Sequence, residues 1–379
     1  MRVCVFSDTY LPQVNGVSNT VHRLKESMDT SGIDNMLVVP GDANTQYHDN
    51  TLRFDGLNFF LYPELKLVLP RYSEIKEQLD RFKPDLIHLV TEFSLGLAGL
   101  KYARDHAVPI VSSYHTNFPD YLKYYNFQFL EEVIWKYLKW FHSFSRINYC
   151  PTSVTLLKLQ EKGFNNLELW SRGIDSKRFN PGWRDHLIRE KYAAHNEPLL
   201  LYVGRLAPEK ELSVLMNAAG ILNSKDIAYK MVIVGDGPSR IALENEKPDN
   251  VCFAGYKSGQ ELQAFYASAD LFVFPSSTET YGNVILEAMA SGLPVVGAYG
   301  GGVIENLIHE YNGLAFSPGN YFNMAECMEK LIIDPQLRQS MSANALHHVS
   351  AKDWPAVFNS LFAGYAKVIK ENKLINKSA

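Results

Sequence analysis

The chain has 379 residues, which is more than one compact hydrophobic core usually serves, so we expect two domains. Hydrophobic residues make up 46% and charged residues 21% of the sequence, as in an ordinary globular enzyme. The formal net charge of -4 argues against nucleic acid as a partner, and no stretch has the length and apolarity of a membrane span. The N-terminus lacks a signal-peptide pattern. Scattered cysteines without metal-ligand spacing favour buried free thiols and a cytoplasmic location: Cys4, Cys150, Cys252 and Cys327.

Short apolar runs alternate with longer helix-patterned segments along the chain, which is typical of βα units stacked around parallel sheets. In the first half, the runs predict strands at Val3–Phe6, Met36–Val39, Leu86–Val90, Ile110–Ser113 and Ile147–Cys150. In the second half, they predict strands at Leu199–Val203, Met231–Val234, Val251–Ala254, Leu271–Phe274 and Val295–Val296.

The segment SRGIDSKRFNPGWRD, residues 171–185, separates the two series of strands. It is rich in Gly, Pro and charge, as an exposed inter-domain linker would be. The pattern therefore predicts an α/β fold of two doubly wound, Rossmann-like domains that face each other across a cleft. Because ligands of such sheets bind at the carboxyl ends of the strands, we expect the active site in that cleft.

The segment TETYGNVILEAMASGLPVV, residues 278–296, carries two glutamates eight positions apart, Glu279 and Glu287. A helix is predicted to begin near Tyr281 or Gly282, with Glu279 in the loop before it. Glu287 lies further along the helix, where a carboxylate can accept hydrogen bonds from a ribose diol. An ordinary βα turn explains this local pattern equally well. The free backbone N–H groups of a helix start would form an anion site at Gly282, Asn283 and Val284.

A second segment, YVGRLAPEK at residues 202–210, places Arg205 and Lys210 after a strand that ends at Gly204. Two cations at the carboxyl end of a strand suit a diphosphate, whose leaving oxygen gains negative charge during transfer. In isolation, both residues are better explained as solvated loop charges. Their position in the same domain as Glu279 favours a phosphate-binding role.

Three weaker signals follow other predicted strands. Gly237, in a Gly-Asp-Gly turn, permits close approach of a ligand, although a tight turn explains it equally well. Gly16 lies between the first strand and its helix but lacks the full G-x-G-x-x-G pattern. His115 follows the strand Ile110–Ser113 and should point into the cleft, although a lone histidine is more often structural. No Asp-x-Asp pair or clustered His and Cys predicts a metal, and no G-x-S-x-G elbow predicts a serine hydrolase.

Together these segments resemble family 4 of the retaining glycosyltransferases, which have the GT-B architecture, over nearly the whole chain. Glu279 and Glu287 match the E-x7-E motif of that family, and GRLAPEK matches its phosphate-binding Arg and Lys. SDTYLPQVNGVSNTV and SYHTNFPDY resemble the branch of GDP-mannose-dependent mannosyltransferases. DWPAVFNSLFAGYAKVIKENK resembles the helix that returns to the N-terminal domain. The resemblance implies an acceptor-side domain of residues 1–172 plus about 355–379, and a donor domain of residues 173–354.

The resemblance also implies roles for individual residues. Glu279 would hold hydroxyls of the donor sugar, Glu287 the ribose, and Arg205 and Lys210 the departing diphosphate, with no metal or other cofactor. His115 would lie near the donor sugar on the acceptor side. The sequence departs from the family at Glu211, where relatives often have Gly. Backbone or side-chain contacts to the donor are further expected at Gly16, Gly204, Gly237, Tyr256, Tyr281, Gly282, Asn283 and Val284.

The acceptor, expected to be a lipid or a glycan, is the less defined substrate. Residues 121–146 are rich in aromatic and basic side chains, which fits both an amphipathic face on an anionic membrane and a core helix with solvated charges. Three alternatives remain: a UDP-glucose or other UDP-hexose donor, a non-hydrolysing nucleotide-sugar epimerase, and a non-catalytic sugar-nucleotide-binding protein. The residues near the expected base site, Gly255 to Lys257, do not separate guanine from uracil.

Overall fold

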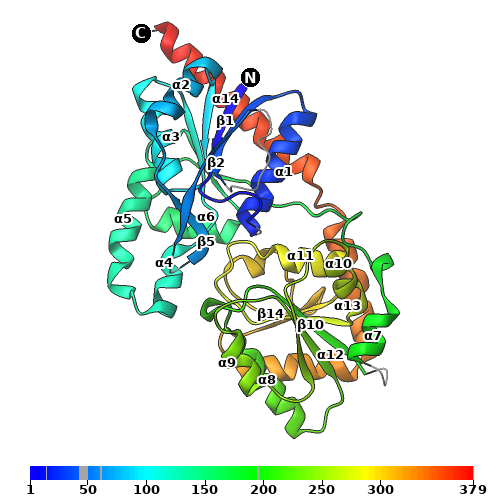
Figure 1. Ribbon diagram of the computed structural model, residues 1–379. Coiled ribbons are helices and arrows are strands. Elements are labelled where there is room, and N and C mark those ends of the chain that lie inside the picture. The colour runs from blue at the N-terminus through cyan, green and yellow to red at the C-terminus, as the bar shows by residue number, and fades with distance from the viewer. Residues whose placement is uncertain (14, 42–49, 60–61, 194–196, 379) are drawn as a thin grey trace. The chain divides into compact units, whose positions relative to one another are not determined.

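The structure is a computed structural model that describes residues 1–13, 15–41, 50–59, 62–193 and 197–378 (Figure 1). The chain divides into two compact units. Unit 1 comprises Met1–Pro119, Gln128–Ser171 and Pro355–Ala379, and unit 2 comprises Asp120–Phe127 and Arg172–Trp354. The assignment of residues 120–127 to unit 2 was not anticipated from the sequence.

Unit 1 is built on a sheet of parallel strands in the order β3-β2-β1-β6-β7-β8-β9, and every strand predicted in the first half is present. The additional strands β3 and β9 lie at the two edges, and a separate antiparallel hairpin joins β4 to β5. The strands are β1 Arg2–Phe6, β2 Asp34–Pro40, β3 Thr51–Phe54, β4 Gly56–Phe59, β5 Tyr62–Val68, β6 Leu86–Leu89, β7 Ile110–Ser113, β8 Ile147–Cys150 and β9 Leu167–Leu169.

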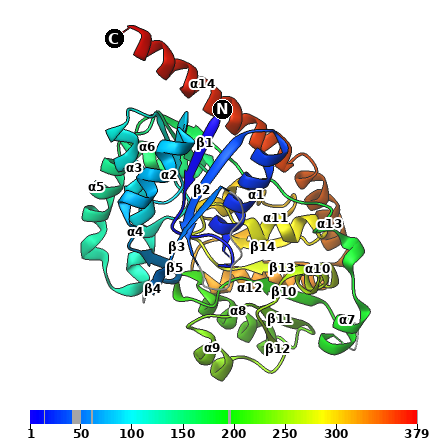
Figure 2. The ribbon, with the colours of Figure 1, turned by 45° about the horizontal axis from the view of Figure 1, so that its top comes forward.

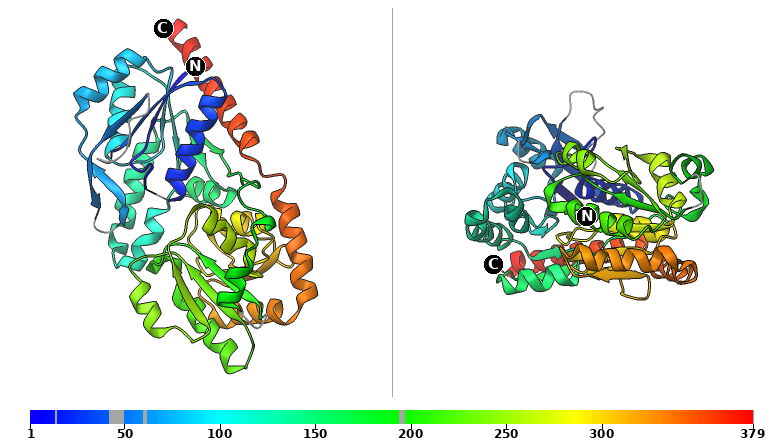
Figure 3. Two further views of the ribbon diagram at one scale, coloured as in Figure 1. Left: turned by 45° about the vertical axis from the view of Figure 1, so that its right-hand side comes forward. Right: turned by 90° about the horizontal axis from the view of Figure 1, so that it is seen from below.

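Helices cover both faces of this sheet, with α1 and α14 on one face and α2 and α3 on the other (Figures 1 and 2). The last helix, α14, belongs to unit 1 because residues three or four positions apart turn one stripe into the core. That stripe contains Phe358, Leu361, Tyr365 and Val368. Met1 lies beside the second half of α14 (Figure 3). The helices are α1 Gly16–Thr30, α2 Tyr72–Phe82, α3 Ser94–Asp105, α4 Phe118–Tyr121, α5 Glu131–His142, α6 Ser153–Glu161 and α14 Trp354–Ser378, with 3-10 turns η1 Leu122–Tyr125 and η2 Gln128–Leu130.

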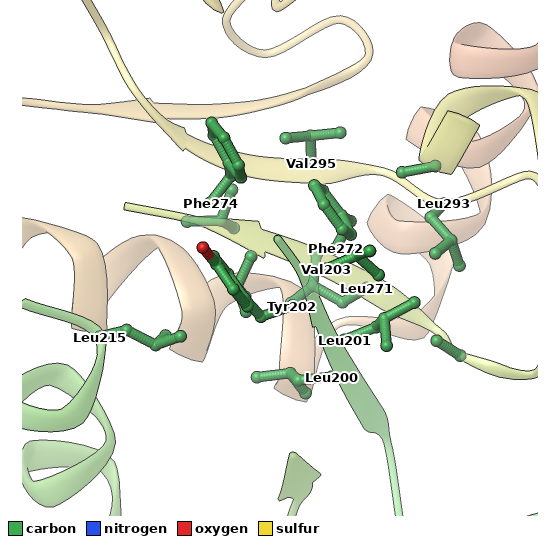
Figure 4. Packing of buried hydrophobic residues seen from close by; sticks show 14 of the residues in the cluster. Leu200, Leu201, Tyr202, Val203, Leu215, Leu271, Phe272, Phe274, Leu293 and Val295 are labelled. Carbon is green, nitrogen blue, oxygen red and sulfur yellow. The ribbon is translucent and has the colours of Figure 1, made fainter. Parts of the chain in front are cut away.

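Unit 2 contains a second parallel sheet in the order β12-β11-β10-β13-β14-β15. Large apolar side chains of β10 and β13 pack together in its core (Figure 4). There the rings of Tyr202 and Phe274 stack with centroids 6.2 Å apart. Every strand predicted in the second half is present, and β15 is an additional edge strand. The strands are β10 Leu199–Val203, β11 Lys230–Val234, β12 Val251–Gly255, β13 Leu271–Phe274, β14 Val295–Ala298 and β15 Gly313–Phe316.

The helices of unit 2 also lie on both faces of their sheet: α8, α9 and α12 on one face, and α10, α11 and α13 on the other (Figures 1 and 2). Both units are therefore doubly wound, as predicted. The helices are α7 His186–Tyr192, α8 Leu212–Ser224, α9 Arg240–Glu246, α10 Gly259–Ser268, α11 Asn283–Ala290, α12 Tyr321–Ile333 and α13 Pro335–Val349, with 3-10 turns η3 Pro181–Trp183, η4 Pro208–Lys210 and η5 Gly301–Glu305.

The segment 171–185 is not exposed throughout, contrary to the prediction of an exposed linker. Arg172 and Phe179 are 5% and 4% exposed, and the segment belongs to unit 2 from Arg172 onward. The Ile174 N–H donates to the Lys352 carbonyl at 2.8 Å, which ties the start of unit 2 to its end. The composition of segment 171–185 correctly predicted that it is polar, but it did not reveal that Arg172 and Phe179 are buried and anchor it to unit 2.

The cysteines are free thiols, as expected, with Cys252 half-buried and the other three buried. Among the helices in the described part of the chain, none is long and apolar enough to cross a membrane.

Candidate functional site

Lys210 and Glu279 form an ion pair at the carboxyl ends of two neighbouring strands of unit 2. Lys210 ends η4, after β10, and Glu279 lies in the loop after β13. The strand order reverses between β10 and β13, which is the point where doubly wound sheets bind ligands. Burial lowers the pKa of Lys210, but the adjacent Glu279 carboxylate more than reverses this, so the pKa lies well above its usual value. Lys210 is therefore a fixed positive charge at neutral pH.

Arg205 follows β10 directly after Gly204 and lies beside a buried carboxylate. Its Nη1 atom is 3.7 Å from Oε1 of Glu209, which is 1% exposed. The Tyr125 hydroxyl donates to Oε2 of Glu209 at 2.9 Å. The carboxylate of Glu209 thus orients the guanidinium of Arg205 near the loop that carries Lys210. Neither Glu209 nor Tyr125 was identified from the sequence, because 84 positions separate them.

Glu211, the departure from the family pattern, has a φ of +52°, in the left-handed region that favours glycine. Its side chain compensates by accepting three hydrogen bonds. Oε2 accepts from the N–H and Oγ of Ser277 at 3.1 and 2.9 Å, and Oε1 accepts from the Tyr124 hydroxyl at 2.9 Å. The backbone geometry expected for Gly is therefore retained with Glu.

Contacts on two sides hold the loop that carries Glu279. The Glu209 carbonyl accepts from the hydroxyls of Ser276 and Thr278, each at 3.2 Å, so the two charged loops are bonded to each other. On the other side, the Gly302 N–H donates to the Glu279 carbonyl at 2.6 Å. A Cβ at Gly301 would lie 2.5 Å from the same carbonyl oxygen, so the backbones pack without room for a side chain. The glycine run 300–302 was the available sequence signal for this support.

The helix predicted after Glu279 is α11, which begins at Asn283, with Gly282 as its N-cap at a φ of +79°. The first two N–H groups of this helix, those of Asn283 and Val284, have no intrahelical acceptors, whereas the Ile285 N–H donates to the Gly282 carbonyl at 2.9 Å. Tyr281 is one of the predicted substrate contacts; its side chain is 4% exposed, and its hydroxyl donates to the Arg172 carbonyl at 3.0 Å. Burial raises the pKa of Tyr281. Only its backbone is left to line a ligand, because its ring completes the core.

Glu287 is half-buried on α11, and its Oε2 accepts from the Tyr266 hydroxyl at 2.9 Å. Burial, reinforced by this carboxylate, raises the pKa of Tyr266 well above its usual value, so Tyr266 remains a donor.

Tyr256 follows β12 and is 56% exposed. A Cβ at Gly237 would overlap the Leu206 carbonyl oxygen of the neighbouring loop. The geometry therefore gives Gly237 a packing role.

The two remaining candidates, Gly16 and His115, belong to unit 1. Gly16 is the exposed first residue of α1, which Asn15 caps by accepting from the N–H groups of Val17 and Ser18 at 3.0 and 2.8 Å. His115 follows β7 and is 8% exposed. Its Nε2 is 2.8 Å from Oγ of Ser113, and its ring meets that of Trp170 edge to face at 5.5 Å.

Comparisons with known proteins agree with this architecture. The model of Glycosyltransferase Family 4 matches residues 14–178, and that of Glycosyl transferases group 1 matches residues 184–348. A GDP-mannose-dependent alpha-mannosyltransferase of Corynebacterium glutamicum is 32% identical, over 97% of this chain and 89% of the relative. An alpha-monoglucosyldiacylglycerol synthase of Streptococcus pneumoniae is 29% identical, over 93% and 83%. The structure of sucrose-phosphate synthase of Thermosynechococcus elongatus matches with a TM-score of 0.81 at 20% identity, over 98% of this chain and 99% of the other.

These matches give no support to an epimerase, and they confirm the predicted fold of two Rossmann-like domains. The sequence of this chain, the strand-end loops of unit 2 and the matches over nearly its full length agree on one assignment: the chain belongs to the GT-B glycosyltransferases that combine a Family 4 region with a group 1 region.

Proposed function

We propose that this chain transfers mannose from GDP-mannose to a lipid acceptor, with retention of the anomeric configuration and without a metal ion. The observation that carries the proposal is the Lys210–Glu279 ion pair at the point where the strand order reverses. It offers a cation for a diphosphate and a carboxylate for sugar hydroxyls in one place. The names of the two relatives support the donor and the acceptor: one is GDP-mannose-dependent, and the other synthesises a diacylglycerol glycolipid.

The donor diphosphate would be bound by Arg205, Lys210 and the first turn of α11. During transfer, the bond between the sugar C1 and the phosphate oxygen breaks, and negative charge develops on that oxygen. Arg205 and Lys210 stabilise this charge, as do the N–H groups of Asn283 and Val284. The acceptor oxygen attacks C1 from the same face, and its proton passes to the departing phosphate. Retention therefore needs no protein nucleophile.

The two carboxylates of the E-x7-E motif would bind the two sugars of the donor. Glu279, fixed by Lys210 and the glycine run 300–302, accepts hydrogen bonds from the hydroxyls of the transferred sugar. Glu287, oriented by the Tyr266 hydroxyl, accepts from the ribose diol. Within the described residues there is no cluster of three His, Cys, Asp or Glu side chains that could hold a metal ion. Charge neutralisation is thus assigned to the two cations.

A lipid acceptor calls for contact with a membrane, and α5 offers a suitable face. Phe129 in η2, together with Val133, Lys136 and Trp140 in α5, forms what we call the α5 stripe; the four residues are spaced as one helical face. Phe129 is 75%, Val133 61% and Trp140 45% exposed. The other aromatic residues of α5 are buried or half-buried, and residues 121–127 belong to unit 2. We therefore narrow the membrane contact from the whole segment 121–146 to the α5 stripe. Exposed apolar side chains with a lysine suit the boundary of an anionic bilayer.

The donor is tested by incubating the purified chain with GDP-mannose or UDP-glucose, an excess of chelator and vesicles containing diacylglycerol. We expect release of GDP and formation of an α-mannosyl lipid, with the anomeric configuration read from the C1–H1 coupling. Transfer from UDP-glucose but not from GDP-mannose would show that the donor is UDP-glucose. A β-linked product would contradict retention, and activity that is lost with chelator and restored by Mg²⁺ or Mn²⁺ would contradict metal independence.

The α5 stripe is tested by cosedimentation with vesicles of anionic or zwitterionic lipid. Changing Phe129→Ser together with Trp140→Ser should reduce binding to anionic vesicles about tenfold or more, because two large apolar side chains no longer enter the interface. Trp183→Ser is the matched control, since Trp183 is 36% exposed on unit 2. Equal binding by all variants would remove the stripe from the proposal.

A further inference from the structure

A continuous chain of hydrogen bonds runs through the interior of unit 1 to His115. The Tyr365 hydroxyl of α14 is 2.6 Å from Nδ1 of His88, on β6. Nε2 of His88 is 3.0 Å from Oγ of Ser113, at the end of β7. The same Oγ is 2.8 Å from Nε2 of His115. Tyr365 and His88 are fully buried, and Ser113 is 1% exposed.

The sheet register explains why these groups meet. His88 lies opposite Val111 on β7, so Ser113, two residues further, points to the same side of the sheet. Ser113 in turn lies opposite Tyr149 on β8. A Cβ at Gly364 would overlap the Tyr149 hydroxyl, so glycine at this position lets α14 approach the sheet closely. This approach brings Tyr365 to His88.

The chain has a defined direction. A neutral imidazole carries one N–H, so His88 donates from one ring nitrogen and accepts at the other. Within the described residues, the Tyr365 hydroxyl has one hydrogen-bond partner, His88. If His88 donated to Tyr365, the buried tyrosine proton would lack an acceptor, which is costly. Burial raises the pKa of Tyr365 well above its usual value, so this proton is retained.

It follows that Tyr365 donates to Nδ1 of His88, and His88 donates from Nε2 to Ser113. The Ser113 hydroxyl, which has one proton, then donates it to Nε2 of His115. We propose that this chain holds His115 in the tautomer with its proton on Nδ1, which makes Tyr365 a positioning residue for His115. His115 then presents an N–H donor to a substrate oxygen. This last step rests on the proposed glycosyl transfer, whereas the tautomer itself does not.

The tautomer is measured on the full chain labelled with ¹⁵N in the histidine rings, by long-range ¹H–¹⁵N correlation without any substrate. We expect an Nε2–H pattern for His88 and an Nδ1–H pattern for His115. In Tyr365→Phe, His88 loses its donor, and both rings should show a mixture of tautomers. Tyr149→Phe is the matched control: its hydroxyl is buried beside the same rings but has no hydrogen-bond partner in the described part of the chain. Its spectrum should match that of the unchanged protein.

An Nε2–H pattern for His115 in the unchanged protein, or unchanged tautomers in Tyr365→Phe, would overturn the proposal. Ser113→Ala provides a second test, because it interrupts the chain in the middle. In this variant His115 should show a mixture of tautomers, whereas His88 should keep its Nε2–H pattern because Tyr365 still donates to it. If Ser113→Ala leaves His115 as Nδ1–H, Tyr365 does not act through the chain.

Transfer kinetics supply the functional arm. Tyr365→Phe should lower kcat about fivefold to tenfold with little change in the KM for the donor, as expected for one oriented hydrogen bond in the transition state. Adding Tyr365→Phe to Ser113→Ala should cause little further loss, because the chain is already broken. If the spectra behave as expected and no donor is turned over, the proposed function fails and the tautomer chain stands.

Discussion

The carboxyl ends of the strands carry different chemistry in the two units. In unit 2, charged side chains gather there and bind one another, with Lys210 and Glu279 as the central pair. In unit 1, neutral groups form the chain that ends at His115. Asp8, after β1, is a buried carboxylate, but its Oδ1 accepts from the Ser94 hydroxyl and the Leu95 N–H, at the start of α3.

This difference shows that one architecture can carry two kinds of side-chain chemistry at its strand ends. Both units alternate strands and helices around parallel sheets, so the strand pattern alone does not determine the chemistry. The residues that follow the strands determine it. Charges suit a diphosphate, whereas neutral donors of fixed direction suit the hydroxyls of a sugar or an acceptor.

The largest expected effect tests the charged side of this comparison. Lys210→Ala should lower kcat/KM for transfer about 10³-fold, because the charge on the leaving diphosphate goes uncompensated. Lys225→Ala is the matched control, since Lys225 forms a surface ion pair with Glu329 in the same unit. It should change the rate less than about twofold. A Lys210→Ala variant with a rate near that of the unchanged protein would break the comparison.

The second prediction separates packing from ligand binding at Gly237. Gly237→Ala should lower the free energy of unfolding by about 2–3 kcal/mol, because the new methyl group overlaps the Leu206 carbonyl and the backbone φ is strained. Urea unfolding measures this effect. Gly220→Ala in α8 is the matched control: a Cβ at this position has no neighbouring atom within 4 Å, so the substitution should stabilise the chain slightly. A raised KM for the donor with unchanged stability would instead support the ligand role predicted from the sequence.

The third prediction concerns the departure from the family at Glu211. Glu211→Ala loses the hydrogen bonds from Ser277 and Tyr124 and keeps the left-handed backbone, so we expect a loss of about 2 kcal/mol in unfolding free energy. Glu211→Gly loses the same bonds but relieves the backbone, so its loss should be about 1 kcal/mol smaller. Equal stability of the two variants would show that the backbone strain is negligible.

The smallest expected effect concerns acid stability in unit 2. Burial lowers the pKa of His348 to about 4, with help from Lys352 and His347. Between pH 6.5 and 4 the unfolded chain binds a proton that the folded chain does not, so this group destabilises the fold as the pH falls. His348→Gln should therefore retain about 1 kcal/mol more stability at pH 4.5, relative to pH 7.5, than the unchanged protein. Parallel stability curves for the two proteins would contradict this assignment.

The sequence predicted the interior strands well, because a buried parallel strand is a continuous apolar run. It missed β9, because LEL at an edge is half-buried to exposed and carries little signal. It placed Arg205, Lys210 and Glu279 in the loops after β10 and β13, because these residues are close to strand ends in the chain. It did not predict that the Tyr281 side chain is buried, since the start of a helix does not reveal which side chain turns into the core.

The contacts that could not be predicted join residues far apart in the chain. His88 and Tyr365 are separated by 277 positions, and Tyr124 and Glu211 by 87. A histidine inside the apolar run LIHLV was the visible hint of a buried polar partner, but the sequence does not indicate which one. Such pairs depend on how α14 and residues 120–127 pack, which no local pattern encodes.

The return of α14 to unit 1 has a consequence for synthesis on the ribosome. Residues 172–354 of unit 2 emerge before the 25 residues of α14, so unit 1 begins first and is completed last. A nascent chain that stops before α14 leaves the positions of Phe358, Leu361 and Val368 in the core unfilled. It also lacks Tyr365, the first donor in the chain to His115. Only a chain translated through α14 therefore acquires both the closed core of unit 1 and the hydrogen-bond chain from Tyr365 to His115.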